Sequence, residues 1–274
     1  MAIDFVKISL DVKDKVFLVT GGAAGVGAGI VRALLNTNAR HVAFLDIAER
    51  EGAALEKELT DKFGALRAKF IKCDVSDEDQ LSAAYNQILD KYRRLDGVIN
   101  NAAVLGVTEH SVKRMVDVNF SATVHGTMKA IEVMGVDKDG QGGTIVNISS
   151  LLALHPSTHF PVYAATKTAV LQFSIAPKFY EKSKVRVLTV CLGPTDTAIL
   201  QRTNSGNLNA VAQVTSRVSV RQKVESAVKG IIEVIDKGTS GSTWIIKDDK
   251  PAYDKFLLFM LSVDLEMILN GPGF

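Results

Sequence analysis

The chain has few of the residues that build disulfide or metal frameworks. Only two of its 274 residues are cysteine, Cys73 and Cys191, and each lies in an apolar run typical of a strand end. No cluster of His, Cys and Asp has the spacing of a metal site. This pattern favours two buried free thiols, no metal, and a reducing, cytoplasmic setting.

An excess of charge and a long apolar run are also missing. The chain has 32 Lys and Arg against 30 Asp and Glu, which gives no nucleic-acid footprint and no polybasic membrane patch. No run of about 18 apolar residues predicts a spanning helix. The nearest candidate, residues 256–269, is interrupted by Asp264 and Glu266. Residues 1–10 lack a cationic region followed by an apolar stretch, so we expect no secretory signal.

The chain does contain a regular alternation of short apolar runs and longer amphipathic stretches. Seven strands are predicted at residues 15–20, 41–46, 68–73, 97–101, 144–149, 185–191 and 242–246. Helical periodicity follows them at residues 26–36, 49–62, 77–93, 110–134, 163–182 and 224–237. The first five strands are nearly all apolar, as parallel strands covered on both faces are. The pattern predicts an α/β protein with a Rossmann-type, doubly wound, mostly parallel sheet flanked by helices, in one domain over residues 1–274.

Two segments fall outside this alternation. Residues 194–223 are long and polar and follow the sixth strand. Since ligands bind beyond the carboxyl ends of strands in such sheets, we expect a substrate loop there. The tail, residues 250–274, contains the apolar stretch 256–261. We expect it to pack on its own domain or a neighbouring subunit, with membrane-surface contact or a cover over the pocket as alternatives.

A glycine-rich turn joins the first predicted strand to the first helix. Gly21, Gly25 and Gly27 have the spacing Gly-x3-Gly-x-Gly. Glycine allows backbone N–H groups to approach a pyrophosphate at the positive end of a helix. Glycine is common in any turn, but its position between a strand and a helix favours dinucleotide binding.

Acidic residues follow the next two strands. Asp46 lies about 20 residues beyond the turn, where an acid binds the adenosine ribose hydroxyls. It is followed by Ile47 and Ala48 rather than by a cation, so a 2′-phosphate would be repelled and NAD is favoured over NADP. Capping of the next helix is a compatible role for Asp46. Asp74 could bond the adenine amino group or act as a turn or capping residue.

A tyrosine and a lysine four residues apart, Tyr163 and Lys167, share one face of a predicted helix. Free tyrosine has a pKa of about 10, and lowering it to roughly 7.5 needs about 3.4 kcal/mol of preferential stabilisation of the phenolate. A neighbouring ammonium and a cationic cofactor ring could supply this in a partly dry site. Taken alone, such a pair also occurs in ordinary helices.

Together these motifs resemble the short-chain dehydrogenase/reductase family over nearly the whole chain. Their order and intervals agree with the family: the glycine turn, Asp74, Asn100-Asn101-Ala102-Ala103, Asn119, Ser150, Tyr163 and Lys167, then Gly193 and Thr197. Residues 161–163, 197–200 and 241–244 are most similar to insect-type alcohol dehydrogenases and 15-hydroxyprostaglandin dehydrogenases.

The resemblance implies a role for each site residue. Tyr163 would be the general acid and base, Lys167 would lower its pKa, and Ser150 would donate to the substrate oxygen. Asn119 would hold a water in a proton relay, with a hydrogen bond to nearby helix backbone as the alternative. The residues expected to bind NAD are Gly21, Ala24, Gly25, Val26, Gly27, Asp46, Asp74, Val75, Asn101, Ala102, Tyr163, Lys167, Gly193, Thr195 and Thr197.

Three positions depart from the expected pattern. Ala103 replaces a usual glycine, and its methyl group would crowd the backbone beside the cofactor unless φ there is negative. Leu-Gly-Pro at residues 192–194 displaces a usual Pro-Gly, which puts the geometry beside the nicotinamide in doubt. Pro177 should kink the helix predicted at residues 163–182.

The apolar segment between Ser150 and Tyr163 predicts a hydrophobic alcohol or ketone as substrate. The expected pocket residues are Leu152, His155, His159 and Phe160, although both histidines could be ordinary loop or packing residues. The family resemblance also implies a homodimer or homotetramer paired through helices 110–134 and 163–182.

The sequence therefore predicts an NAD-dependent oxidoreductase that interconverts a hydrophobic alcohol and its carbonyl. One alternative is an NADPH-dependent carbonyl reductase, which would differ mainly at Asp46. The other is a weakly catalytic dinucleotide-binding or storage protein on the same fold. The intact set of Ser150, Tyr163, Lys167 and Asn119 argues against the second alternative.

Overall fold

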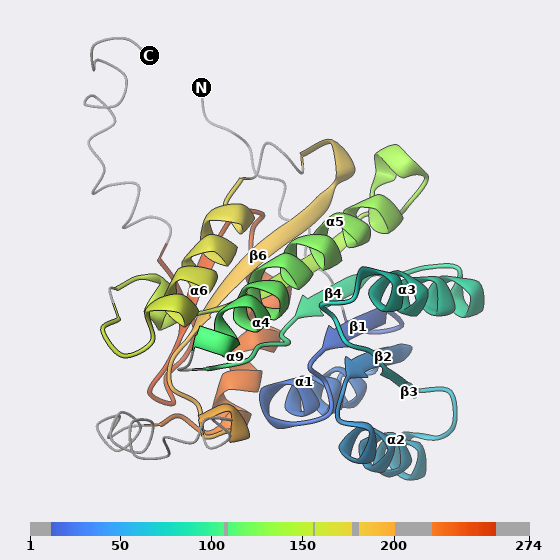
Figure 1. Ribbon diagram of the computed structural model, residues 1–274. Helices are drawn as coiled ribbons and strands as arrows, with labels where there is room; N and C mark the ends of the chain where they lie inside the picture. Colours follow the sequence, from blue (N-terminus) through green and yellow to red (C-terminus); the bar gives the residue numbers. More distant parts are fainter. Residues whose placement is uncertain (1–11, 107–108, 156, 177–180, 201–220, 256–274) are drawn as a thin grey trace.

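The computed structural model describes residues 12–106, 109–155, 157–176, 181–200 and 221–255. They form one eight-stranded sheet flanked by helices, with the strand order β3-β2-β1-β4-β5-β6-β7-β8 (Figure 1). The order runs outward in both directions from β1 and β4, so successive crossovers leave the sheet on opposite sides there. The predicted doubly wound, mostly parallel α/β fold is confirmed.

The strands follow the apolar runs of the sequence closely. The parallel strands are β1 (Val16–Thr20), β2 (His41–Asp46), β3 (Ala68–Lys72), β4 (Gly97–Asn100), β5 (Gly143–Ser150), β6 (Val185–Leu192) and β7 (Thr243–Ile246). Every residue of β1 and β4 is buried, because helices cover both faces of the sheet. The prediction of seven strands was one short. An antiparallel strand β8 (Tyr253–Asp254) pairs with β7, and its two exposed residues give no hydrophobic pattern.

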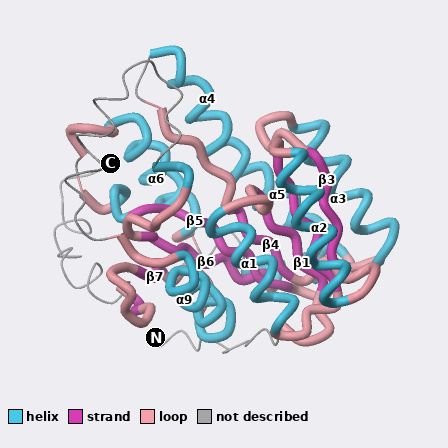
Figure 2. Tube along the Cα trace, turned by 90° about the horizontal axis from the view of Figure 1, so that it is seen from below, coloured by secondary structure: helices cyan, strands magenta, loops and turns pink. Residues whose placement is uncertain are grey.

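Helices cover the sheet in two layers. The main helices are α1 (Gly25–Asn36), α2 (Glu49–Phe63), α3 (Glu78–Tyr92), α4 (Val112–Val116), α5 (Ala122–Met134), α6 (Pro161–Ser174) and α9 (Val224–Lys237). One apolar core joins α1, α2 and α9 to one face of the sheet, and a second joins α3 and α5 to the other (Figure 2). Short helical turns are η1 (Glu109–Ser111), η2 (Asp117–Ser121), η3 (Val136–Lys138), η4 (Leu151–Ala153), η5 (Glu181–Ser183) and η6 (Ala198–Leu200).

Two of the predicted helices differ from the structure. The helix predicted at residues 110–134 is divided into η1, α4, the π-helical turn η2 and α5. The helix predicted at residues 163–182 begins earlier, with Pro161 in its first turn, and ends at Ser174. The predicted kink at Pro177 is therefore wrong, because the helix stops before the proline, and Pro177 itself lies outside the described residues.

The remaining sequence predictions concern thiols and termini. Cys73 and Cys191 are free and buried, as predicted. Most of the predicted substrate loop, residues 201–220, and most of the predicted tail, residues 256–274, lie outside the described residues, so the assignment of residues 1–274 to one domain stays a prediction. No helix within the described ranges is both long and apolar enough to cross a membrane.

Candidate active site

A cavity of about 700 Å³ opens at the carboxyl edge of the sheet. Each strand from β1 to β6 contributes a lining residue at or just after its end: Gly21, Asp46, Cys73, Asn101, Ser150 and Gly193. Every residue predicted to bind the cofactor lines this cavity. The sheet topology thus brings together motifs that are far apart in the sequence.

The glycine turn presents the start of α1 to the cavity. Gly21 and Gly25 have φ values of +64° and +52°, in the left-handed region that favours glycine. A Cβ added to Gly27 would lie 2.0 Å from the Gly21 carbonyl oxygen, so only glycine allows this close approach. The N-cap residue of α1, Ala24, makes no side-chain capping bond, and the first turn carries no acid. The N–H groups at this helix start therefore fit a pyrophosphate.

Asp46 joins the end of β2 to the glycine turn. Its Oδ2 accepts a hydrogen bond from the Ala23 N–H at 3.1 Å, and its Oδ1 accepts one from the Ala48 N–H at 3.0 Å. Ala48, not Asp46, is the N-cap residue of α2, so the expected capping role is wrong. The next residue along the cavity wall is Ile47, which is 57% exposed. An acid followed by an apolar side chain suits two ribose hydroxyls better than a 2′-phosphate.

Asp74 is held by a cation that the sequence analysis did not identify. One carboxylate oxygen accepts from the Ser76 N–H at 3.0 Å, and the other lies 2.9 Å from Nη1 of Arg114. Burial raises the pKa of Asp74, but the hydrogen bonds from Arg114 and Ser76 outweigh it and leave the pKa below its ordinary value. Asp74 is thus a turn residue, as its alternative role predicted. Arg114, from α4, also lines the cavity, and nothing in its local sequence distinguishes it from a surface arginine.

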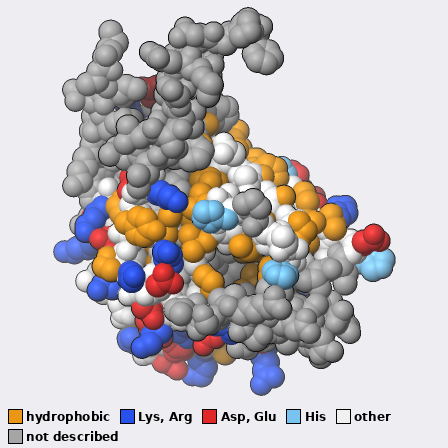
Figure 3. All heavy atoms as spheres, turned by 90° about the vertical axis from the view of Figure 1, so that its left-hand side faces the viewer, with side chains coloured by type: hydrophobic (Ala, Val, Ile, Leu, Met, Phe, Trp, Pro, Cys, Tyr) orange, Lys and Arg blue, Asp and Glu red, His pale blue; other side chains and the backbone are white. Residues whose placement is uncertain are grey.

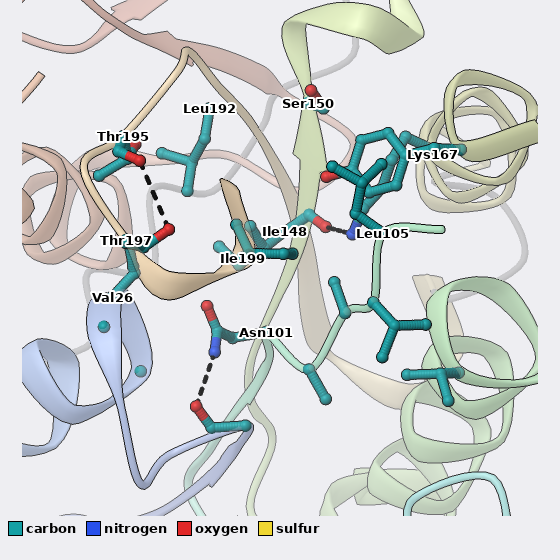
Figure 4. A pocket seen from close by; sticks show the side chains of 18 of the residues that line it. Val26, Asn101, Leu105, Ile148, Ser150, Lys167, Leu192, Thr195, Thr197 and Ile199 are labelled. Atoms are coloured by element: carbon teal, nitrogen blue, oxygen red, sulfur yellow. Dashed lines mark hydrogen bonds between the residues drawn. The ribbon is translucent and has the colours of Figure 1, made fainter. Parts of the chain in front are cut away.

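The ends of β1 and β4 are tied together beside the glycine turn. Thr20 Oγ1 accepts from the N–H groups of Asn101 and Ala102, both at 3.0 Å. Asn101 Nδ2 donates to the carbonyl oxygens of Thr20 and Gly21 at 3.0 and 3.1 Å, and Figure 4 draws one bond from this amide. The conflict expected at Ala103 does not arise, because its φ lies outside the left-handed region.

Ser150, Tyr163 and Lys167 meet where α6 packs on the end of β5. Lys167 is 2% exposed, its Nζ donates to the Ile148 carbonyl oxygen at 2.8 Å, and Nζ lies 5.8 Å from the centroid of the Tyr163 ring (Figure 4). Ser150 Oγ accepts from the Leu152 N–H at 3.2 Å, and both Ser150 and Tyr163 line the cavity. The structure therefore brings the predicted proton-transfer residues together.

Without a ligand in the cavity, burial is the largest influence on the pKa of both Tyr163 and Lys167. It raises the pKa of Tyr163 to about 12, against a lowering effect of the hydrogen bond with Ser150. It lowers the pKa of Lys167 to about 8. The pKa of Tyr163 thus moves away from the expected value of roughly 7.5, because burial penalises the charged phenolate. A depressed Tyr163 pKa depends on further positive charge in the cavity.

Asn119 lies in the π-helical turn η2 and is fully buried. Its Oδ1 accepts from the Val104 N–H at 2.8 Å, while its Nδ2 donates to the Val104 carbonyl oxygen at 3.0 Å and to Thr166 Oγ1 at 3.2 Å. The side chain therefore fixes the segment after β4 against α6, and Asn119 does not line the cavity. The backbone that Asn119 bonds belongs to the loop after β4 and not to a nearby helix, so the alternative role is not what the structure contains, and the water relay stays a prediction.

The substrate end of the cavity is more apolar than the predicted residues suggest. Leu152, His159 and Phe160 line it, whereas His155 is exposed and is not among the lining residues. Apolar residues absent from the prediction extend the same wall: Val104, Leu105, Leu151, Leu192, Ala198 and Ile199. Several follow the ends of β4 and β6, a position that could have identified them. Leu105 and Ile199 lie on either side of Ile148 in the view of Figure 4.

On one side of the molecule, apolar and charged side chains at the surface are also separated from each other. Figure 3, which shows the side at the left of Figure 1, has hydrophobic side chains gathered in its middle and charged ones mostly toward its margins. Within the parts of the chain that are described, no three His, Cys, Asp or Glu side chains form a group that could hold a metal ion.

The buried ammonium of Lys167 should cost stability. We expect Lys167→Met to be at least as stable as the wild type at about pH 7, because a desolvated charge is removed. The folded pKa of about 8 lies below the ordinary 10.5, so between these values the unfolded state binds more protons and wild-type stability rises with pH. The stability difference between the two proteins should therefore shrink by about pH 10.

Urea denaturation at about pH 7 and about pH 10 measures this difference. The exposed Lys250 provides the control, since Lys250→Met should show no comparable dependence. A gap between Lys167→Met and wild type that stays constant or widens with pH would contradict the assignment of a buried charge.

Comparisons with known proteins agree with this geometry. A family model described as short chain dehydrogenase matches residues 15–208. The chain is 34% identical over 195 residues to 15-hydroxyprostaglandin dehydrogenase [NAD(+)] of Macaca fascicularis, covering 70% of this chain and 72% of that protein. It is 29% identical over 195 residues to alcohol dehydrogenase 1 of Ceratitis capitata, covering 70% and 74%.

A solved structure shows the same fold. The 3-ketoacyl-(acyl-carrier-protein) reductase from Brucella melitensis, complexed with NADH, aligns with a TM-score of 0.75 at 21% identity over 86% of this chain and 98% of that one. At this identity the likeness concerns the fold alone. The family match over residues 15–208 carries the further conclusion. The chain belongs to the short-chain dehydrogenase family of oxidoreductases.

Proposed function

We propose that this protein is an NAD-dependent dehydrogenase that interconverts a hydrophobic alcohol and its carbonyl compound. One observation carries the proposal: a single cavity has an uncapped helix start and Asp46 at one end and the Ser150, Tyr163 and Lys167 cluster at the other. A dinucleotide bound from one end of this cavity to the other would have its reactive ring beside the proton-transfer residues.

Each part of the cavity suits one part of NAD. The backbone at Gly25 and Val26 would bind the pyrophosphate, Asp46 the adenosine ribose, and Lys167 the nicotinamide ribose. The names of relatives support this choice, since 15-hydroxyprostaglandin dehydrogenase is designated [NAD(+)]. When bound, the nicotinamide accepts the hydride from the alcohol carbon, which is chemistry that no side chain supplies.

The chain's own residues handle the proton. Ser150 donates a hydrogen bond to the substrate oxygen and favours the negative charge that develops there. Tyr163 takes the hydroxyl proton as general base in oxidation and returns it as general acid in reduction. Lys167, desolvated behind the tyrosine ring, stabilises the phenolate. Asn119 would place a water next to Lys167 and complete a path to solvent.

The charge distribution favours a neutral, apolar substrate. The charged side chains that line the cavity within the described residues are Asp46, Asp74, Arg114 and Lys167, and all of them belong to the cofactor or proton-transfer parts. In the segment between Ser150 and the start of α6, the polar residues that line the cavity are Ser157 and His159. A hydrophobic secondary alcohol or ketone, lipid-like or isoprenoid, matches this lining.

We also propose that the protein is a homodimer or homotetramer in a reducing, cytoplasmic setting. Val112 and Val116 of α4 and Met128 of α5 are 39%, 39% and 41% exposed. Such exposed apolar side chains on adjoining helical segments suit contact with a second copy. The buried free thiols Cys73 and Cys191 are compatible with a reducing compartment.

Replacing Tyr163 by phenylalanine tests the proton-transfer assignment. Turnover should fall by roughly a thousandfold, because the general acid and base is lost while the ring and its packing remain. NADH should bind as it does to the wild type, which fluorescence titration measures. Tyr253→Phe, at an exposed position in β8, is the matched control and should turn over normally. Near-native turnover in Tyr163→Phe would refute the assignment.

Asp46→Asn tests the cofactor preference. The amide keeps a similar shape but removes the negative charge that would repel a 2′-phosphate. We expect the ratio of kcat/KM for NADP to that for NAD to rise about tenfold, the effect of about 1.4 kcal/mol. Glu49→Gln removes an exposed charge nearby, at the start of α2, and should leave the ratio unchanged. A wild-type enzyme that prefers NADP would overturn the proposal.

A substrate panel tests the apolar-pocket argument. Initial rates of NADH formation with hydrophobic secondary alcohols, and of NADH consumption with the matching ketones, should exceed those with short polyols. Each buried CH2 group contributes about 0.8 kcal/mol, so kcat/KM should increase about fourfold per methylene until the cavity is filled. Activity confined to short polar polyols would contradict a hydrophobic substrate.

A further inference from the structure

A short strip of chain, residues 192–197, runs along the cavity from the end near Ser150 to the end near the glycine turn. Leu192, the last residue of β6, pairs with Ser150 in the sheet. At the other end, a Cβ added to Gly25 would lie 3.2 Å from Cγ2 of Thr197. In Figure 4, Ser150, Leu192, Thr195, Thr197 and Val26 follow one another along this side of the pocket. The position of the strip therefore determines the space left for the part of a dinucleotide between these ends.

One buried side chain outside the cavity holds this strip. Gln222 is 1% exposed, and its Nε2 donates to Thr195 Oγ1 at 3.0 Å and to the Ile246 carbonyl oxygen, at the end of β7, at 3.1 Å. Its backbone adds two further bonds. The Gln222 N–H donates to the Pro194 carbonyl oxygen at 2.9 Å, and the Gln222 carbonyl oxygen accepts from the Asp196 N–H at 3.0 Å.

The amide of Gln222 acts here only as a donor. Thr195 Oγ1 donates onward to the Gly193 carbonyl oxygen at 3.0 Å, so the Thr195 hydroxyl has a partner on each side and faces Gln222 rather than a ligand. The Ile246 carbonyl oxygen also accepts from the Gly193 N–H at 2.8 Å. Oε1 of Gln222 is buried and has no partner among the described residues. An acid or an apolar side chain of the same length cannot supply these donors.

The displaced proline is part of the same arrangement. Residue 192 is leucine instead of the usual proline, and it is the last residue of β6, where it pairs with Ile246. Pro194 lies in the strip, and its carbonyl oxygen accepts from the Gln222 N–H. The segment after β6 thus lacks the family's usual proline at its start and is held instead from the far end of the loop, by Gln222.

We propose that Gln222 is the positioning residue for the nicotinamide end of the cavity. By holding Thr195 against the end of β7, it fixes the strip between Ser150 and Gly25 at the distance from the opposite wall that a nicotinamide riboside needs. This role rests on the proposed NAD-dependent function. Gln222 does not line the cavity, so it acts through the strip and not by touching the cofactor.

Binding of NADH and of ADP-ribose to the Gln222→Met variant separates this role from general damage. ADP-ribose has the pyrophosphate and the adenosine but no nicotinamide, so it uses the glycine turn and Asp46 without the catalytic end. We expect the Kd of NADH, by fluorescence titration, to rise about tenfold, as the loss of well-placed hydrogen bonds does. The Kd of ADP-ribose, by calorimetry, should equal that of the wild type.

Lys223→Gln, at the adjacent exposed side chain, is the matched control and should change neither Kd. An unchanged Kd for NADH in Gln222→Met, or an equal rise for both ligands, would overturn the proposal. A wild-type protein that binds ADP-ribose and NADH to no measurable extent would instead refute the NAD-dependent function itself, so the two failures are distinguishable.

Thr195 provides a second pair of variants if Gln222→Met does not fold. Thr195→Val removes the hydroxyl that joins Gln222 to the strip, whereas Thr195→Ser keeps it. Thr195→Val should raise the Kd of NADH and not that of ADP-ribose, and Thr195→Ser, which keeps the hydroxyl, should raise the Kd of NADH less than Thr195→Val does. Equal effects of valine and serine on NADH binding would contradict the role assigned to the hydrogen bond.

Discussion

The hydrogen bonds that join the ends of β1 and β4 are the constraint on which the rest of the site depends. Thr20 Oγ1 accepts hydrogen bonds from two backbone N–H groups, and Asn101 Nδ2 donates to the carbonyl oxygens of Thr20 and Gly21. These bonds satisfy backbone groups at the point where the strand order reverses, where neighbouring crossovers diverge. They hold the glycine turn against the start of the Ala102 segment, so two adjoining walls of the cavity are fixed together. A strand end that moved here would shift both walls.

A second constraint is the exclusion of water around the proton-transfer residues. Lys167 is almost completely buried, and burial both lowers its pKa and raises that of Tyr163. The protein by itself therefore holds these groups in a state that disfavours the phenolate. Positive charge on a ligand in the cavity would favour the phenolate, so the proposed function couples proton transfer to cofactor binding electrostatically. We expect this arrangement to reduce stability, since a cation is held where burial disfavours its charge.

Much of this architecture could be predicted from the sequence because it depends on local patterns. Buried parallel strands require nearly continuous apolar runs, so β1 to β6 appear at the expected positions. The glycine turn and Asp46 follow strand ends at fixed intervals, and so does Ser150. Local patterns did not predict the elements whose position or length depends on tertiary contacts. The two-residue strand β8, the π-helical turn at Asn119 and the end of α6 at Ser174 have no signature in local hydrophobicity.

The sequence by itself determined the class of fold, the strand ends that carry the motifs, and which residues form the proposed proton-transfer set. These depend on residue type and on spacing along the chain. Only the tertiary structure decided which distant groups meet. Arg114 contacts Asp74, Asn119 holds Val104, and Gln222 holds Thr195. His155 is exposed and does not line the cavity, whereas His159 does. The physical reason is that such contacts are fixed by how elements pack across the sheet, and packing joins residues whose separation in sequence carries no information about their distance.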